Sequence, residues 1–311
     1  MTAAAVDIDI VALGEPMIEF NQTRMGEPTY LQGFGGDTSN ALIAAARQGA
    51  KTAYLTRLGE DRFGAMLMDL WRRESVVTDA VRIDPQAHAA VYFVNHDAQG
   101  HSFSYLRAGS AASRMQPADL DLALIAKARF LHVSGISQAI SASAYDTVFA
   151  AIAHARASGV MVSYDANLRL KLWPLARAQA IIRATIASSD YFLPSLEDAQ
   201  QFTGLNDKDT IIDWCLDVGA RQILLKLGGD GVIVADAARR VHVPGYSVNA
   251  IDATGAGDCF AGSLLARLAA GDDVLVAARY ANAAAALTTT GFGAVAPIPA
   301  PQQVQALLAK A

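Results

Sequence analysis

The chain has 311 residues, of which 52% are hydrophobic and 18% charged, and its formal net charge is −5. The length suits one large domain with a small insertion, and an acidic balance without a Lys/Arg run argues against nucleic acid or an anionic membrane as a partner. No segment resembles a signal peptide or reaches the roughly 20 apolar residues of a membrane span, and two cysteines are too few for a disulfide framework or a zinc site. We therefore expect a protein of the reducing cytoplasm.

Short β-rich runs alternate with longer helical patterns along the chain. The expected strands are Ile8–Leu13, Thr52–Thr56, Phe130–Val133, Val160–Tyr164, Tyr191–Leu193 and Gln222–Leu227. The expected helices include Ser39–Arg47, Phe63–Glu74, Ser143–Ala157 and Pro174–Ala187. This order is typical of an α/β protein with a parallel sheet covered by helices on both faces, and such sheets bind ligands beyond the carboxyl ends of their strands.

Two segments depart from this alternation. The stretch from Met17 to Gly33 is extended and polar, without a helical pattern. The stretch from Val91 to Tyr105 is typical of a hairpin with its turn at 97–100. We expect one domain over residues 1–311, in which segments at about 17–33 and 88–108 form a small β-strand lid.

A glycine-rich turn precedes the first expected helix. Gly35 and Gly36 allow the backbone to approach a small ligand, and Asp37 and Asn40 can form hydrogen bonds with hydroxyl groups. The alternative is an ordinary turn into a capped helix.

A second such turn, within 251–262, precedes a helix with apolar residues at helical spacing. Gly255 and Gly257 would let the first helix amides, which lack partners and carry partial positive charge, contact a phosphate. A carboxylate beside a phosphate is unfavourable unless it removes a proton, so Asp258 is a candidate general base. The alternative is a capping aspartate.

Both turns, in this order, closely resemble the two signatures of the ribokinase-like (phosphofructokinase-B type) carbohydrate kinases. The resemblance implies a three-layer α/β/α fold with a mostly parallel central sheet and a lid. It implies that Asp258 is the catalytic base and that the amides of Gly255, Ala256 and Gly257 form an anion hole. It also implies ATP and Mg²⁺, with K⁺ as a further candidate, and a homodimer or larger homo-oligomer in which lid strands pack together.

Within this family the chain is most similar to 2-keto-3-deoxygluconate kinases, through Gly14–Glu19, Phe34–Thr38, Tyr105–Ala111 and Asp165–Arg169. An acidic sugar needs a cation for its carboxylate, and the planar guanidinium of arginine fits one. Either arginine in these motifs could instead lie on the surface. The substrate-binding residues expected from the resemblance and the turns are Gly35, Gly36, Asp37, Asn40, Tyr92, Tyr105, Arg107, Arg169 and Asp258.

The sequence has no P-loop, and Lys226–Gly231 instead resembles the family's loop along the nucleotide. A hairpin turn at that place is equally compatible with these residues. In the family's metal-supporting motif Ser195 replaces an asparagine and Asp198 a glutamate, so Asp198 is the candidate that supports a metal through water. The residues expected near ATP are Asn167, Lys226, Gly228, Gly229, Gly231, Gly255, Gly257 and Asn282.

The combined expectation is a kinase that uses ATP to phosphorylate the 6-hydroxyl of 2-keto-3-deoxy-D-gluconate. The nearer alternatives are related kinases that act on fructose, ribose, a nucleoside or the 4-epimer 2-keto-3-deoxygalactonate. A sugar or nucleotide sensor without catalysis is the alternative from another class, and retention of Asp258 with both glycines argues against it.

Overall fold

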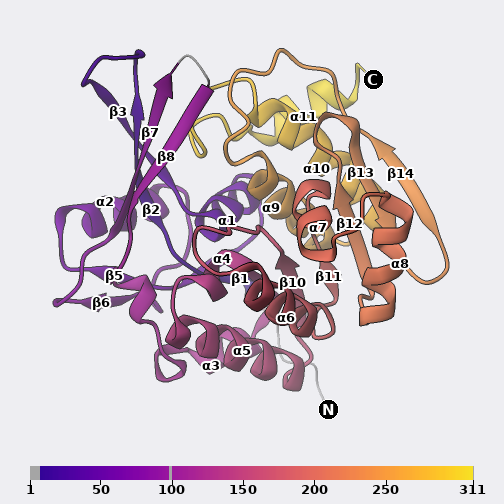
Figure 1. The fold of residues 1–311 in the computed structure, drawn as a ribbon, viewed down its shortest axis with the longest axis horizontal. Helices are drawn as coiled ribbons and strands as arrows, with labels where there is room; N and C mark the ends of the chain where they lie inside the picture. The colour runs from indigo at the N-terminus through magenta and orange to yellow at the C-terminus, as the bar shows by residue number, and fades with distance from the viewer. Residues whose placement is uncertain (1–7, 98–99, 311) are drawn as a thin grey trace.

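An eight-stranded sheet crosses the molecule in the computed structural model, which describes residues 8–97 and 100–310 (Figure 1). Its strand order is β14 (Arg240–Pro244), β13 (Gly231–Ala235), β12 (Gln222–Lys226), β11 (Tyr191–Phe192), β10 (Met161–Asp165), β9 (Ala128–Ser134), β1 (Ile8–Leu13) and β4 (Thr52–Leu55). Strands β12 to β4 are parallel, and β13 and β14 add an antiparallel edge. The six expected strands are confirmed, with ends that differ by at most two residues.

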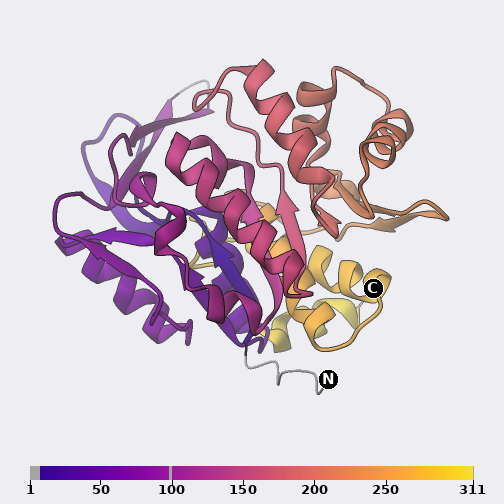
Figure 2. The same cartoon turned by 90° about the horizontal axis from the view of Figure 1, so that it is seen from below.

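Helices cover both faces of this sheet because successive side chains of a strand point to opposite faces (Figure 2). In β1, Ile10 and Ala12 belong to one hydrophobic core, and Val11 and Leu13 belong to the other. The first core is completed by α1 (Asp37–Arg47), α2 (Arg62–Arg73), α9 (Ala256–Ala269), α10 (Val274–Thr288) and α11 (Pro301–Leu308). The second is completed by α3 (Leu122–Ala126), α4 (Gly135–Ala139), α5 (Ala142–Ala157), α6 (Leu175–Ile186), α7 (Leu196–Thr203) and α8 (Lys208–Val218). Short 3₁₀ turns lie at Ala112–Arg114, Pro117–Asp119 and Gly228–Asp230. The expected three-layer α/β/α arrangement is confirmed.

The two segments that depart from the alternation meet in a separate four-stranded sheet, seen at the upper left of Figure 1. Its strand order is β3 (Tyr30–Gly35), β2 (Met17–Gln22), β7 (Ala90–Asp97) and β8 (Gly100–Leu106). The two hairpins are antiparallel, and the central pair β2–β7 is parallel. The expected lid strands are therefore present, although part of the predicted turn, residues 98–99, lies outside the described chain. Strands β5 (Arg57–Gly59) and β6 (Arg82–Asp84) form a further small pair.

Helices α1 and α9 pack together unusually closely at Gly262. A methyl group on Gly262 would lie 2.0 Å from the carbonyl oxygen of Ala41 and 2.9 Å from the Cβ of Ala44, so only glycine fits there. Small buried residues on both helices permit this approach. As a result, the amino-terminal ends of α1 and α9 lie side by side at one edge of the main sheet.

Both cysteines, Cys215 and Cys259, are buried free thiols in the hydrophobic cores. Within the described residues, none of the helices combines the length and the apolar character that a bilayer crossing requires.

We predict that Gly262→Ala destabilises the fold by about 1–3 kcal/mol, because the added methyl group overpacks the contact between α1 and α9. Thermal and urea unfolding would measure the change. Gly229→Ala is the matched control, since its methyl group would meet no other described atom within 4 Å. Equal melting temperatures for Gly262→Ala and the wild type would contradict the packing described here.

Candidate active site

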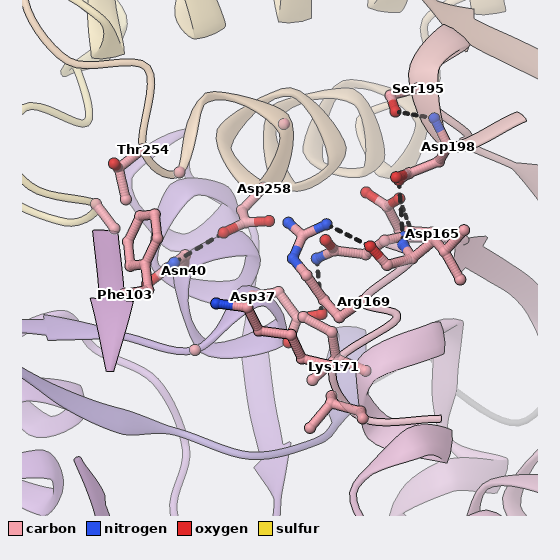
Figure 3. A pocket seen from close by; sticks show the side chains of 18 of the residues that line it. Asp37, Asn40, Phe103, Asp165, Arg169, Lys171, Ser195, Asp198, Thr254 and Asp258 are labelled. Atoms are coloured by element: carbon pink, nitrogen blue, oxygen red, sulfur yellow. Dashed lines mark hydrogen bonds between the residues drawn. The ribbon is translucent and has the colours of Figure 1, made fainter. Parts of the chain in front are cut away.

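A cavity of about 700 Å³ lies at the carboxyl edge of the parallel strands, beneath the lid sheet (Figure 3). Its volume is within the range of small-molecule sites. Loops that follow four parallel strands, the first turns of α1 and α9, and lid strands β7 and β8 supply its walls. The cavity brings together most of the predicted site residues: Gly36, Asp37, Asn40, Tyr92, Tyr105, Arg107, Asn167, Arg169, Asp198, Lys226, Gly228, Gly255, Gly257 and Asp258.

Two helices begin at this cavity without a side-chain cap. The capping positions are Gly36 and Gly255, with φ values of 102° and 77° that favour glycine. The amides of Gly255 and Gly257 have no described protein acceptor, so they are available to a ligand. Uncapped amino-terminal turns attract anions, and phosphate groups are the natural ligands of such a place.

Asp258 lies in the first turn of α9 and does not cap that helix, so the alternative of a capping aspartate is not supported. Its Oδ2 accepts a hydrogen bond of 2.8 Å from Nδ2 of Asn40, at the start of α1 (Figure 3). Burial and the neighbouring Asp37 carboxylate raise the pKa of Asp258 to about 7, while the Asn40 bond acts in the opposite direction. A carboxylate with such a pKa can accept a proton near neutral pH.

Asn167 joins two carboxylates behind this base. Its Nδ2 donates to Oδ2 of Asp37 at 3.0 Å, and its backbone N–H donates to Oδ1 of Asp165 at 3.2 Å. The residue has a φ of +32°, one of only two positive values among described non-glycine residues. Such strain is retained where surrounding contacts fix the backbone, commonly at functional sites. Burial raises the pKa of Asp37 as well.

Lys226 ends β12 and forms an ion pair of 2.6 Å with Asp165, which ends β10. A methyl group on Gly257 would lie 3.4 Å from Nζ of Lys226, so this ammonium group lies beside the uncapped turn of α9. The sequence reasoning identified Lys226 but not Asp165. A charged residue at the end of an apolar strand was the signal that could have revealed Asp165.

Asp198 reaches the cavity from α7, whose amino terminus is capped by Ser195. Its Oδ2 accepts a bond of 3.1 Å from the Leu168 backbone, and burial raises its pKa. The described residues contain no group of three or more metal-ligating side chains. Mg²⁺ commonly binds one or two carboxylates together with water and substrate phosphates. Asp198 and Asp165 are oxygen donors of the right kind for it.

The lid side of the cavity contains an ion pair that the sequence did not predict. Arg107 binds the carboxylate of Glu15, which is 1% exposed and also accepts a hydrogen bond from Ser110. The Arg107 guanidinium lies 5.5 Å from the ring centroid of Tyr105. The charge of Arg107 is therefore largely balanced by the protein itself.

Arg169 differs from Arg107 because it forms no ion pair with a described carboxylate. Its Nη1 donates to the Leu168 carbonyl at 2.8 Å, and the side chain is exposed at the cavity. Lys171, which was not predicted, also lines this side (Figure 3). The rim formed by Arg169 and Lys171 is the cationic part of the cavity, and an anionic ligand would be attracted there.

Five predicted residues do not line the cavity. The Ala256 amide donates to the Ala253 carbonyl at 3.2 Å, and Gly35 packs against Tyr92. Gly229 and Gly231 belong to the turn between β12 and β13. Asn282 is buried on α10, where Nδ2 donates to the carbonyls of Val243 and Pro244 at 3.0 Å. These positions give each residue a structural role in the loop or core that it occupies.

Comparisons with known proteins agree on one family. The model of the pfkB family carbohydrate kinases matches residues 7–301. The 2-dehydro-3-deoxygluconokinase of Thermoproteus tenax is 33% identical over 310 residues, covering 97% of this chain and 94% of its own. Fructokinase-2 of Zea mays is 32% identical over 319 residues, with the same shares of 97% and 94%. Among solved structures, the fructokinase from Vibrio cholerae O395, with fructose, ADP and calcium bound, has a TM-score of 0.88 and 29% identity, covering 97% of this chain and 99% of its own.

We predict that kcat/KM rises with pH through about 7 as Asp258 loses its proton. Asn40→Ala should move this midpoint to higher pH, because it removes a hydrogen bond that stabilises the charged carboxylate. Asp37→Asn should move the midpoint to lower pH, because it removes a like charge. Initial rates across pH for the three proteins would measure the shifts. Unchanged midpoints, or shifts in one direction for both variants, would contradict the assignment.

Proposed function

The chain belongs to the pfkB family of carbohydrate kinases, and from this premise we propose that it transfers the γ-phosphoryl group of ATP to the 6-hydroxyl of 2-keto-3-deoxy-D-gluconate. The observation that carries the choice of an acidic sugar is the exposed Arg169 guanidinium, which lines the same cavity as Asp258 and forms no ion pair with a described carboxylate, although its charge acts on Asp198. The similarity to the Thermoproteus tenax 2-dehydro-3-deoxygluconokinase, whose name is a synonym for the same activity, supports this choice.

In this proposal Asp258 is the general base. Its carboxylate takes the proton of the 6-hydroxyl as that oxygen attacks the γ-phosphorus and the bond to the bridging oxygen of ADP breaks. Asn40 holds the carboxylate at its position through the 2.8 Å hydrogen bond. A pKa of about 7 leaves the base ionised in a large fraction of molecules at neutral pH and still basic enough to accept a proton.

The phosphate groups would lie at the start of α9. The amides of Gly255 and Gly257 and the positive end of the helix would stabilise the charge on the transferring group. Lys226, beside Gly257, would contact the phosphates as a point charge. Asp198 would hold Mg²⁺ through water, and the ion would supply positive charge to the phosphates. Asn167 keeps the Asp37 and Asp165 carboxylates in place behind this region.

The acid end of the sugar would bind at the rim formed by Arg169 and Lys171. Guanidinium groups bind carboxylates through paired hydrogen bonds, and Arg169 has donors left for them. Arg107 would contribute less than the motif alone suggested, because Glu15 already balances its charge. The lid strands would close over the sugar and exclude water, so that ATP is not hydrolysed.

Fructose is the second candidate substrate. Fructokinase-2 of Zea mays is almost as similar to the chain as the acid kinase is, and the Glu15–Arg107 pair removes one cation from the cavity. The acid would need the Arg169 guanidinium to bind its carboxylate, whereas fructose has no carboxylate to bind. A substitution of Arg169 therefore distinguishes the two candidate substrates.

We predict that the wild type releases ADP faster with 2-keto-3-deoxygluconate than with fructose or ribose at equal concentration. Arg169→Gln should raise KM for the acid by about 10- to 100-fold, the usual cost of losing charged hydrogen bonds, and leave KM for fructose unchanged. The control is Arg177→Gln, an exposed arginine on α6 outside the cavity. A preference of the wild type for fructose would contradict the proposed substrate, and the 4-epimer would show how selective the site is.

A further inference from the structure

Two lid residues form a buried pair at the edge of the cavity. Glu19 on β2 and Tyr92 on β7 are direct neighbours in the parallel register, and the Tyr92 hydroxyl donates a hydrogen bond to Oε2 of Glu19. Tyr92 lines the cavity, whereas Glu19 is 2% exposed and lies behind it. The tyrosine is thus the member of the pair that a ligand bound in this cavity can reach.

Glycines hold this pair in one arrangement. A methyl group on Gly35 would lie 2.5 Å from the Tyr92 hydroxyl oxygen, and one on Gly293 would lie 3.1 Å from Oε1 of Glu19. The backbone of β3 and of the loop after α10 therefore fits closely around the two side chains. Little space remains for either side chain to turn, so packing keeps the Tyr92 hydroxyl and the Glu19 carboxylate in contact.

The hydrogen bond from Tyr92 to Glu19 limits what the tyrosine hydroxyl can offer to a ligand. A tyrosine hydroxyl has one proton to donate and lone pairs that accept. Burial and the adjacent Glu19 raise the pKa of Tyr92 far above its ordinary value, so the proton stays on the oxygen. Because that proton is given to Glu19, only lone pairs remain for a ligand.

We propose that Glu19 is a positioning residue that makes Tyr92 a hydrogen-bond acceptor, so that the site requires a hydroxyl donor of the sugar at this place. The inference deepens the proposed function, since it depends on a sugar bound in this cavity. Tyr105 provides the contrast within the same lid. Its hydroxyl has no hydrogen bond to a described residue and the residue is 38% exposed, so it can donate to a carboxylate or keto oxygen.

The first test replaces Tyr92 with 3-fluorotyrosine by nonsense suppression. Fluorine withdraws electrons from the phenol oxygen, which weakens it as an acceptor and strengthens it as a donor. We expect KM for the sugar to rise several-fold with kcat nearly unchanged. A lower KM would show that Tyr92 donates to the sugar, and an unchanged KM would show that it does not contact the sugar; either result would overturn the proposal.

The second test is a double-mutant cycle of Glu19→Gln and Tyr92→Phe, read as KM and kcat. We expect Glu19→Gln to raise KM in the wild type and to have little further effect once Tyr92→Phe is present, because Glu19 acts through the hydroxyl. The control is Glu27→Gln, an exposed carboxylate in the same lid. Independent effects of the two substitutions, or a lower melting temperature with unchanged KM, would show a merely structural role and overturn the proposal.

The sugar for both tests is chosen from the wild-type rates, either 2-keto-3-deoxygluconate or fructose. Turnover of fructose alone would therefore defeat the proposed substrate and leave the role of Glu19 to be decided by the cycle. Conversely, additive substitutions in an enzyme that prefers the acid would defeat only the inference on Glu19.

Discussion

The close contact between α1 and α9 is the constraint on which the rest of the site depends. Gly262 lies against the backbone of Ala41, and this approach places Asn40 within 2.8 Å of Asp258. The two residues are 218 positions apart in the chain, so only packing can bring them together. The same contact directs two uncapped helix ends into one cavity, where backbone amides and a carboxylate face the same space.

The electrostatics of the cavity follow from that geometry. Three carboxylates lie around the first turns of α1 and α9, those of Asp37, Asp165 and Asp258. Lys226 is close to them and forms an ion pair with Asp165. Burial and like charge make proton binding by Asp258 more favourable, which suits a base that must work near neutral pH. Arg169 and Lys171 lie at the rim. The carboxylates thus surround the first turns of α1 and α9, and the rim adds positive charge that also acts on Asp198.

Much of this arrangement could be predicted from the sequence, because local patterns determine it. The strands were visible as short β-rich runs, and the glycine turns before α1 and α9 indicated where the backbone must approach a ligand. Asp258 is predicted to be a general base because a carboxylate in an anion-binding turn is unfavourable unless it removes a proton. In each case a few adjacent residues contain the whole signal.

The remaining features depend on contacts between distant segments. Glu19 meets Tyr92 because β2 and β7 pair in parallel across the lid, and Glu15 meets Arg107 because β8 lies beside β7 in the same sheet. No local pattern specifies this register. Asn282 is a further case: its motif position predicts a place near the nucleotide, and the structure shows in addition that its amide donates to the end of β14. Sequence spacing cannot distinguish an amide that faces a cavity from one that satisfies buried carbonyls.

The most direct test of the central claim, that Asp258 is the base, is Asp258→Asn. The change keeps the shape of the side chain and removes its ability to accept the proton. Single-turnover phosphoryl transfer should slow by about 10²- to 10⁴-fold, while calorimetry shows sugar and ATP binding within a few-fold of the wild type. A transfer rate within about tenfold of the wild type would contradict the account, since it would mean that the proton leaves by another route.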